Sequence, residues 1–127
     1  MRFDLGTATA NDMTREATDL LRRKQFPIFR TQGVPAPLIQ TEWRNQTPTE
    51  DEAAQGVVEV RSRILVRGRE RASTTSKREF VVTLTMENQV KEEAGGGWIE
   101  IPITSQRTRK ARQIARELEL SLQAIRR

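Results

Sequence analysis

The chain has 127 residues and a mass of 14.6 kDa, the size of one ordinary domain. It contains no cysteine, histidine or tyrosine, so the composition excludes disulfide frameworks, Cys/His metal sites and Ser-His-Asp or Cys-His catalytic groups. Basic side chains outnumber acidic ones by 22 to 17, which gives a formal net charge of +5 and a pI near 10.6.

The beginning of the chain carries no strong structural signal. Residues 1–10 are mostly small and polar, so we expect them to form a flexible lead-in. Residues 11–127 are then expected to form a single α+β domain. The sequence holds no apolar stretch of signal-peptide or membrane-span length, although a signal or lipid anchor removed beforehand would leave no trace.

An amphipathic helix is predicted after this lead-in. Thr9 or Asn11 can supply its N-cap, and Pro27 disfavours helical geometry in the preceding residue, so the helix should end at Gln25 or Phe26. One apolar stripe follows the helical period along this segment. The stripe consists of Met13, Ala17, Leu20 and Leu21.

Two short strands and a loop are predicted next. Residues 28–30 form the first strand, and the glycine and prolines of residues 33–37 interrupt it. Residues 38–44 form the second strand. Residues 45–55 contain a proline and the acidic run at 50–52, so we expect a solvated loop. The second strand should present Ile39, Thr41 and Trp43 on one face.

Two long strands with one apolar face give the clearest pattern in the sequence. Apolar and polar side chains alternate from residue 57 to 67 and again from 79 to 87, as expected for a sheet with one buried face. The three glycines at 95–97 predict a flexible turn into a last, edge strand that contains Pro102. The inward positions are Val58, Val60, Ser62, Ile64 and Val66, then Phe80, Val82, Leu84 and Met86, and finally Ile99, Ile101 and Ile103.

A second amphipathic helix is predicted at the end of the chain, capped by Thr104 or Ser105. The resulting fold class is two-layer α+β, with a mostly antiparallel sheet of about five strands flanked by an N-terminal and a C-terminal helix. The apolar stripe of the last helix consists of Ala111, Ile114, Ala115, Leu118, Leu122 and Ile125.

The sequence gives little support to catalysis. The acidic residues at 50–52 and 92–93 fall in predicted exposed connections and lack the spacing of a metal site or a catalytic carboxylate pair. The glycines at 95–97 lie between strands, which is not the context of a phosphate-binding loop. We therefore expect a protein that is not an enzyme and that uses no cofactor or metal.

The last helix is strongly basic. Residues 105–127 carry seven basic side chains against two acidic ones, and basic charge at a helix start opposes the helix dipole. A nearby acidic loop or an anionic partner could compensate. A solvated face is favoured over nucleic-acid binding, because no aromatic residues are interleaved to stack on bases. The basic residues of the helix are Arg107, Arg109, Lys110, Arg112 and Arg116, and the strand face with Arg61, Arg63 and Arg67 is a further basic patch.

Two apolar residues depart from the pattern of their elements. Trp98 points away from the apolar face of the last strand, and Leu120 lies on the basic side of the last helix. Tryptophan is enriched at binding hot spots. The candidate partner-binding residues are therefore Trp98, Leu120, Arg109, Arg112 and Arg116.

The strand Leu38-Ile39-Gln40-Thr41-Glu42-Trp43-Arg44, together with the element order around it, resembles helix-grip domains of bacterial outer-membrane-associated lipoproteins, in particular the C component of the barrel-assembly machinery. The resemblance implies a non-enzymatic, periplasm-facing domain that docks onto a larger membrane assembly. It covers about residues 11–125 in element order, and the lipidated cysteine of such proteins is missing here.

Two functions follow from these observations. The first is a non-catalytic accessory or scaffold domain of a bacterial envelope assembly, periplasmic or outer-membrane-associated after removal of a targeting segment, that binds a protein partner. The alternative is a small, cytoplasmic, basic domain that binds nucleic acid through the C-terminal arginine-rich helix.

Overall fold

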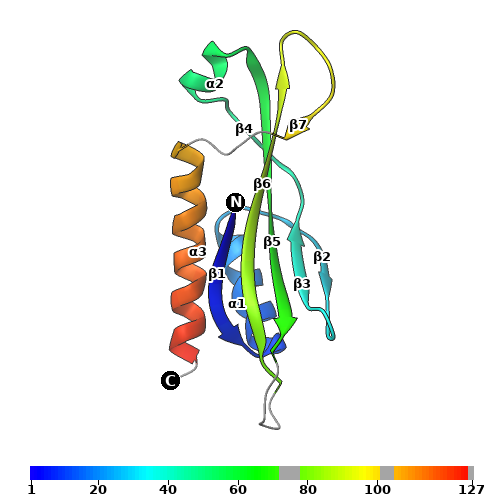
Figure 1. Cartoon of the computed structure of the whole chain (residues 1–127), viewed down its shortest axis with the longest axis vertical. Helices are drawn as coiled ribbons and strands as arrows, with labels where there is room; N and C mark the ends of the chain where they lie inside the picture. Colours follow the sequence, from blue (N-terminus) through cyan, green and yellow to red (C-terminus); the bar gives the residue numbers. More distant parts are fainter. Residues whose placement is uncertain (72–77, 101–104, 126–127) are drawn as a thin grey trace.

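Seven strands and three helices make up the described part of the chain, which comprises residues 1–71, 78–100 and 105–125 of this computed structural model (Figure 1). In chain order the elements are β1 (Arg2–Ala8), α1 (Ala10–Arg23), β2 (Ile28–Gln32), β3 (Leu38–Thr41), β4 (Arg44–Gln46), α2 (Glu50–Ala54), β5 (Val57–Glu70), β6 (Phe80–Glu92), β7 (Ile99–Glu100) and α3 (Ser105–Ile125).

The strands form one antiparallel sheet in the order β1-β6-β5-β3-β2, with β4 beside β5 and β7 beside β6. The long strands β5 and β6 form its centre, where Ile64 lies opposite Met86 and Val66 opposite Leu84. Helices α1 and α3 pack together on one face of the sheet (Figure 1). This arrangement confirms the predicted two-layer α+β class with a terminal helix at each end of the chain.

The predicted apolar stripes build the core between these layers. All four stripe residues of α1 are buried, and Thr9 caps the helix by accepting a hydrogen bond from the backbone of Asp12 at 3.2 Å. The α3 stripe is buried against the same cluster, except that Ile125 is only half-buried. Burial of apolar surface on this scale is the main stabilising contribution to a domain of this size.

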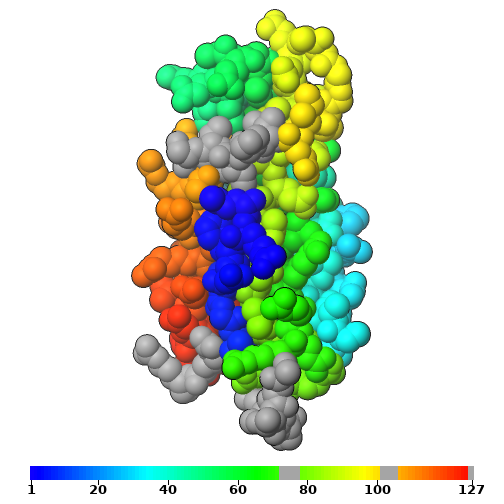
Figure 2. All heavy atoms as spheres, viewed as in Figure 1, coloured from blue at the N-terminus to red at the C-terminus, as the bar shows by residue number. Residues whose placement is uncertain are grey.

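The expected lead-in at residues 1–10 was wrong, because residues 2–8 form strand β1. β1 pairs with β6 and contacts α3, and Figure 2 shows it in blue beside that helix. Leu5 and Ala8 are buried, but a bulge at Gly6, with φ of 88°, separates them by three positions instead of two. The bulge breaks the period of two, so sequence alternation did not reveal the strand.

A second bulge changes the start of β5. The register shifts between Val57 and Glu59, so Val57 is buried and Val58, expected to point inward, is exposed. Leu65, expected on the solvated face, is also buried, and its neighbours in register are Gln40 of β3 and Thr85 of β6. The remaining inward residues of β5 and β6 are buried as predicted.

The expected solvated loop at residues 45–55 was also wrong. It contains the end of β4 and the short helix α2, which begins with a capping box: Thr49 accepts a hydrogen bond from the Glu52 backbone, and the Glu52 carboxylate accepts one from the Thr49 backbone. Glu52 is buried although its two acidic neighbours are exposed. The capping box holds the Glu52 side chain, at the third position of the helix, against the backbone of Thr49, and the Glu52 carboxylate is buried there.

The last strand is short in the described residues. β7 consists of Ile99 and Glu100, and Ile99 is exposed rather than buried. The predicted inward positions Ile101 and Ile103, together with Pro102 and the possible cap Thr104, lie outside the described residues. Before β7 the chain turns through glycines 95 and 96, which have φ of 97° and 98°, as the glycine turn predicted.

Candidate functional site

Five side chains form an alternating series of cations and aromatic rings on the sheet face opposite α1 and α3. The guanidinium of Arg61 lies 4.4 Å from the ring centre of Trp43 and 4.2 Å from that of Trp98. Arg63 lies 4.4 Å from Trp43, and the Lys91 ammonium lies 4.9 Å from Trp98. We call the series Arg63–Trp43–Arg61–Trp98–Lys91 the cation–aromatic ladder.

Four separate segments of the chain position the ladder. Arg61 and Arg63 occupy the outward positions of β5 that alternate with buried residues, and Lys91 lies near the end of β6. Trp98 stands directly before β7, and Trp43 lies in the two-residue link between β3 and β4. Because β4 and β7 border the central strands on opposite sides, the two tryptophans reach Arg61 from both sides.

The position of Trp43 corrects a prediction. Trp43 was expected to share a face with Ile39 and Thr41, but Ile39 belongs to the core beneath the helices while Trp43 stacks on the outer arginines. The strand ends at Thr41 and a new one begins at Arg44. The side-chain alternation is not continuous across this break, so it could not place Trp43.

Hydrogen bonds hold Arg61 between the rings. Its Nε and Nη2 donate to the side-chain oxygen of Gln89 at 2.9 and 2.6 Å. Burial, and then the neighbouring charge of Arg63, lower the pKa of Arg61 from its ordinary value. Arg63 and Lys91 have carboxylate partners, Glu87 at 3.2 Å and Glu59 at 3.6 Å. Within the described ranges Arg61 has no carboxylate partner, so it is an ordered cation without a counter-ion.

The ladder has the chemistry of a binding surface. Both tryptophans are half-buried and thus present part of their rings to solvent, and tryptophan and arginine are the residues most enriched at interface hot spots. Phe29, 61% exposed, adds apolar surface beside Trp43 and Arg63. A side chain held in one orientation loses little entropy when a partner binds. The surface could therefore accept an acidic group of a partner at Arg61, with apolar contacts around it.

The structure separates the sequence-predicted partner residues into two groups. Trp98 belongs to the ladder on one face of the sheet, whereas Leu120 and the three arginines belong to α3 on the other. Leu120 is 50% exposed and all three arginines are exposed. They do not form one surface with Trp98. The α3 group consists of Leu120, Arg109, Arg112 and Arg116.

Arg107 was expected among the solvated cations of α3, but it is buried. Its Nη2 lies 2.8 Å from a carboxylate oxygen of Glu52, and it also donates to the carbonyl of Thr47 at 3.1 Å and to the side chain of Gln46. Hydrogen bonding from Arg107 holds the pKa of Glu52 below its ordinary value despite burial. Of the two compensations that the sequence allowed for the basic helix start, a nearby acidic segment or an anionic partner, the first is present for Arg107 in the form of Glu52.

The described residues contain no group of three or more acidic side chains placed to hold a metal ion, and no helix among them is long and apolar enough to cross a membrane. No protein-family model and no curated protein matches this chain.

The sequence singled out Trp98 as an anchor and Arg61 and Arg63 as part of a basic patch, but it did not indicate Trp43 and Lys91 or the stacking that joins the five side chains. Aromatic residues are absent from the basic part of the last helix, whereas the ladder joins residues from β5, β6 and two connections. One signal was present in the sequence: the chain has two tryptophans, and both fall next to predicted strand ends. The pairing of those ends could not be derived from spacing.

Proposed function

We propose that this protein is a non-catalytic accessory or scaffold domain that binds a protein partner through the cation–aromatic ladder. The observation that supports this most directly is the stacking of Arg61 between Trp43 and Trp98 on the sheet face opposite α1 and α3. The stack holds two half-buried tryptophan rings and an arginine in fixed positions on one face. An interface uses such residues as anchors.

The partner surface that fits the ladder is acidic and partly apolar. Arg61 offers a cation without a described counter-ion, and the adjoining hollow beside Phe29 and Trp43 offers apolar contact. Binding would replace solvent around the rings and give Arg61 a carboxylate. Charge-assisted hydrogen bonds of this kind are stronger than neutral ones and also fix orientation.

We further propose that the domain belongs to a bacterial envelope assembly and faces the periplasm. This part is supported by the resemblance of residues 38–44 and of the element order to helix-grip domains of outer-membrane-associated lipoproteins. In such an assembly the sheet and helices serve as a rigid support, and the ladder presents the contact surface.

The experiment recovers the tagged full chain from fractionated cells in mild detergent, at two salt concentrations and after nuclease treatment. We expect the wild type to bring down a discrete protein of the membrane fraction at both salt concentrations. A Trp43→Ala/Trp98→Ala variant should lose this protein, whereas an Arg109→Gln/Arg112→Gln variant on α3 should keep it. Recovery that depends on the α3 arginines and not on the tryptophans would contradict the proposal.

A second candidate function is nucleic-acid binding through α3. The observation in its favour is that Arg109, Arg112 and Arg116 are all exposed and so are available to phosphates. Binding of this kind weakens steeply as salt rises, because counter-ions are released from the phosphates. Recovery of RNA or DNA from the cytosolic fraction, lost at the higher salt concentration and in the arginine variant, would favour this function instead.

A further inference from the structure

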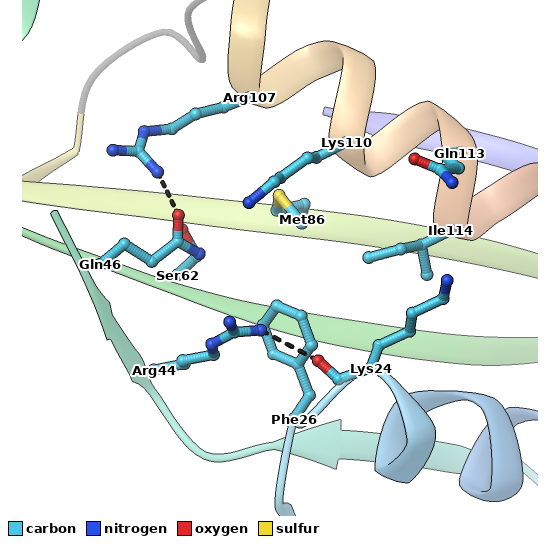
Figure 3. Close-up of a pocket in the computed structure, with 10 residues that line it drawn as sticks. All are labelled: Lys24, Phe26, Arg44, Gln46, Ser62, Met86, Arg107, Lys110, Gln113 and Ile114. Atoms are coloured by element: carbon cyan, nitrogen blue, oxygen red, sulfur yellow. Dashed lines mark hydrogen bonds between the residues drawn. The ribbon is translucent and has the colours of Figure 1, made fainter. Parts of the chain in front are cut away.

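A cavity opens on the helix side of the sheet, between the end of α1, the start of α3 and strands β4, β5 and β6 (Figure 3). Its volume is about 230 Å³. This is smaller than the pockets that hold drug-sized ligands, so it suits a small molecule. The ladder lies on the opposite face of the sheet, so a function of the cavity is independent of the proposed partner surface.

One part of the cavity wall is apolar. Phe26, Met86 and Ile114 come from the segment after α1, from β6 and from α3, and all three are buried. In Figure 3 they surround the interior between the helix and the sheet. A short hydrocarbon chain would gain hydrophobic contact there without opening the core.

Four cations border the same cavity, and two of them are neutralised. The Lys24 ammonium lies 2.8 Å from Glu117, and Arg107 pairs with Glu52. Arg44 donates to the carbonyl of Lys24 at 3.0 Å and stacks 4.9 Å from the Phe26 ring, but it has no carboxylate partner among the described residues. Lys110 forms no ion pair within the described ranges either, and Figure 3 shows it reaching from α3 toward the sheet.

Among the residues that the structure describes, no acidic one lines this cavity or the adjoining hollow, which shares Arg44, Arg107 and Lys110 with it. Two positive charges therefore remain uncompensated next to an apolar wall. A low-dielectric wall strengthens their attraction for an anion. A cationic or neutral ligand would leave these charges unpaired.

A buried polar pair lies at the inner side of the cavity. Ser62 lines it and donates to the side-chain oxygen of Asn88, its in-register neighbour on β6, at 2.6 Å. The Nδ2 of Asn88 has no hydrogen-bond partner among the described residues, although the residue is 3% exposed. Buried amide donors are nearly always satisfied.

We propose that this cavity binds a small organic anion, a carboxylate or phosphate monoester on a short hydrocarbon chain. Arg44 and Lys110 hold the anionic group, and Phe26, Met86 and Ile114 contact the chain. The shared chemistry is an anionic head with an apolar tail, and free metabolites and lipid-derived fragments both supply it.

In the test, the full-length protein is titrated with octanoate, octyl phosphate, inorganic phosphate and octyltrimethylammonium. Binding is measured by calorimetry and by changes in the amide chemical shifts. We expect the two octyl anions to bind about tenfold more tightly than inorganic phosphate, because only they fill the apolar wall. The octyl cation should not bind. Perturbed amides should map to β4, the start of α3 and the segment after α1.

Three variants complete the test. Lys110→Gln should lower the affinity for octyl phosphate about tenfold, because it removes one charge-assisted contact with the ligand. The Lys110 side chain is exposed, so the fold does not depend on it. Arg44→Gln should lower this affinity by a similar factor. The matched control Arg112→Gln, elsewhere on α3, should leave the affinity for octyl phosphate unchanged. Absence of binding, equal binding of the octyl cation, or unchanged binding in the Lys110 variant would overturn the proposal.

Discussion

The carboxylate of Glu52 and the guanidinium of Arg107 meet at 2.8 Å although they are 55 residues apart in the chain. Both side chains are buried, and their ion pair connects α2 to the start of α3. On the central strands the polar Ser62–Asn88 contact lies between the Val60–Val90 pair of the small hydrophobic cluster and the Ile64–Met86 pair of the main one. This end of the molecule is therefore organised by polar contacts.

Removal of Arg107 should be strongly destabilising. Arg107→Ala leaves the buried Glu52 carboxylate without its cation, and breaking a buried pair in this way costs about 3–5 kcal/mol. The free energy of unfolding, measured by urea denaturation with circular dichroism, should fall by that amount. The control Arg109→Ala, an exposed neighbour on the same helix, should change it by about 0.5 kcal/mol or less. Equal effects of the two substitutions would contradict the buried pair.

The same pair predicts a dependence of stability on pH. Because Arg107 lowers the pKa of Glu52 in the folded state, the ionised carboxylate stabilises the fold above the ordinary glutamate value of 4.5, and this contribution is lost as the pH falls through the lowered value. Glu52→Gln should be less stable than wild type near neutral pH. The difference should shrink in acid, as followed by urea unfolding at a series of pH values. A difference that stays constant with pH would refute the assignment.

Gly68 should tolerate no side chain. A Cβ at this position would lie 2.8 Å from Pro37 Cγ, 3.0 Å from Met13 Sδ and 3.1 Å from Phe80 Cβ. Gly68→Ala therefore forces repacking where α1 meets β5, with an expected loss of about 1–3 kcal/mol. Gly33→Ala is the matched control, since a Cβ there meets nothing within 4 Å. Thermal unfolding of both variants should separate them, and an unchanged melting temperature for Gly68→Ala would contradict the packing described.

Strand β1 should contribute to stability as part of the core. Leu5 is 2% exposed, so Leu5→Ala should cost about 2–5 kcal/mol in the free energy of unfolding. Asp4→Ala, its exposed neighbour, should cost about 0.5 kcal/mol or less. If residues 1–10 were a lead-in, neither substitution would alter chemical denaturation, and that result would argue against β1.

The parts of the fold that sequence could predict are those with unbroken periodicity. The helix stripes from Met13 to Leu21 and from Ala111 to Leu122, and the alternation from Phe80 to Met86, are all confirmed by burial. In each case one regular element buries one face, so local spacing is enough to determine orientation. The glycine turn at 95–97 is also confirmed, because a positive φ, as at glycines 95 and 96, is favoured by the glycine residue itself and needs no distant contact.

The parts that sequence could not predict depend on a shift of register or on contacts distant in sequence. The bulge at Gly6 concealed β1, and the break after Thr41 reversed the expected face of Trp43. Glu52 and Arg107 were both expected in solvent, because each lies in a charged run and neither run indicates the other. No local sequence pattern predicts the ladder, because its members come into contact only when the strands pair.

The most direct test of the ladder as a partner surface is in-cell photo-crosslinking from one residue on each face. A photoreactive side chain at position 85, two residues before Glu87 on the outer face of β6, would sample the ladder side, and one at position 112 would sample α3. The proposed function predicts a discrete protein adduct from position 85 that disappears with Trp43→Ala/Trp98→Ala, and none from position 112. Adducts from position 112 alone, or adducts from position 85 that persist without the two tryptophans, would contradict it.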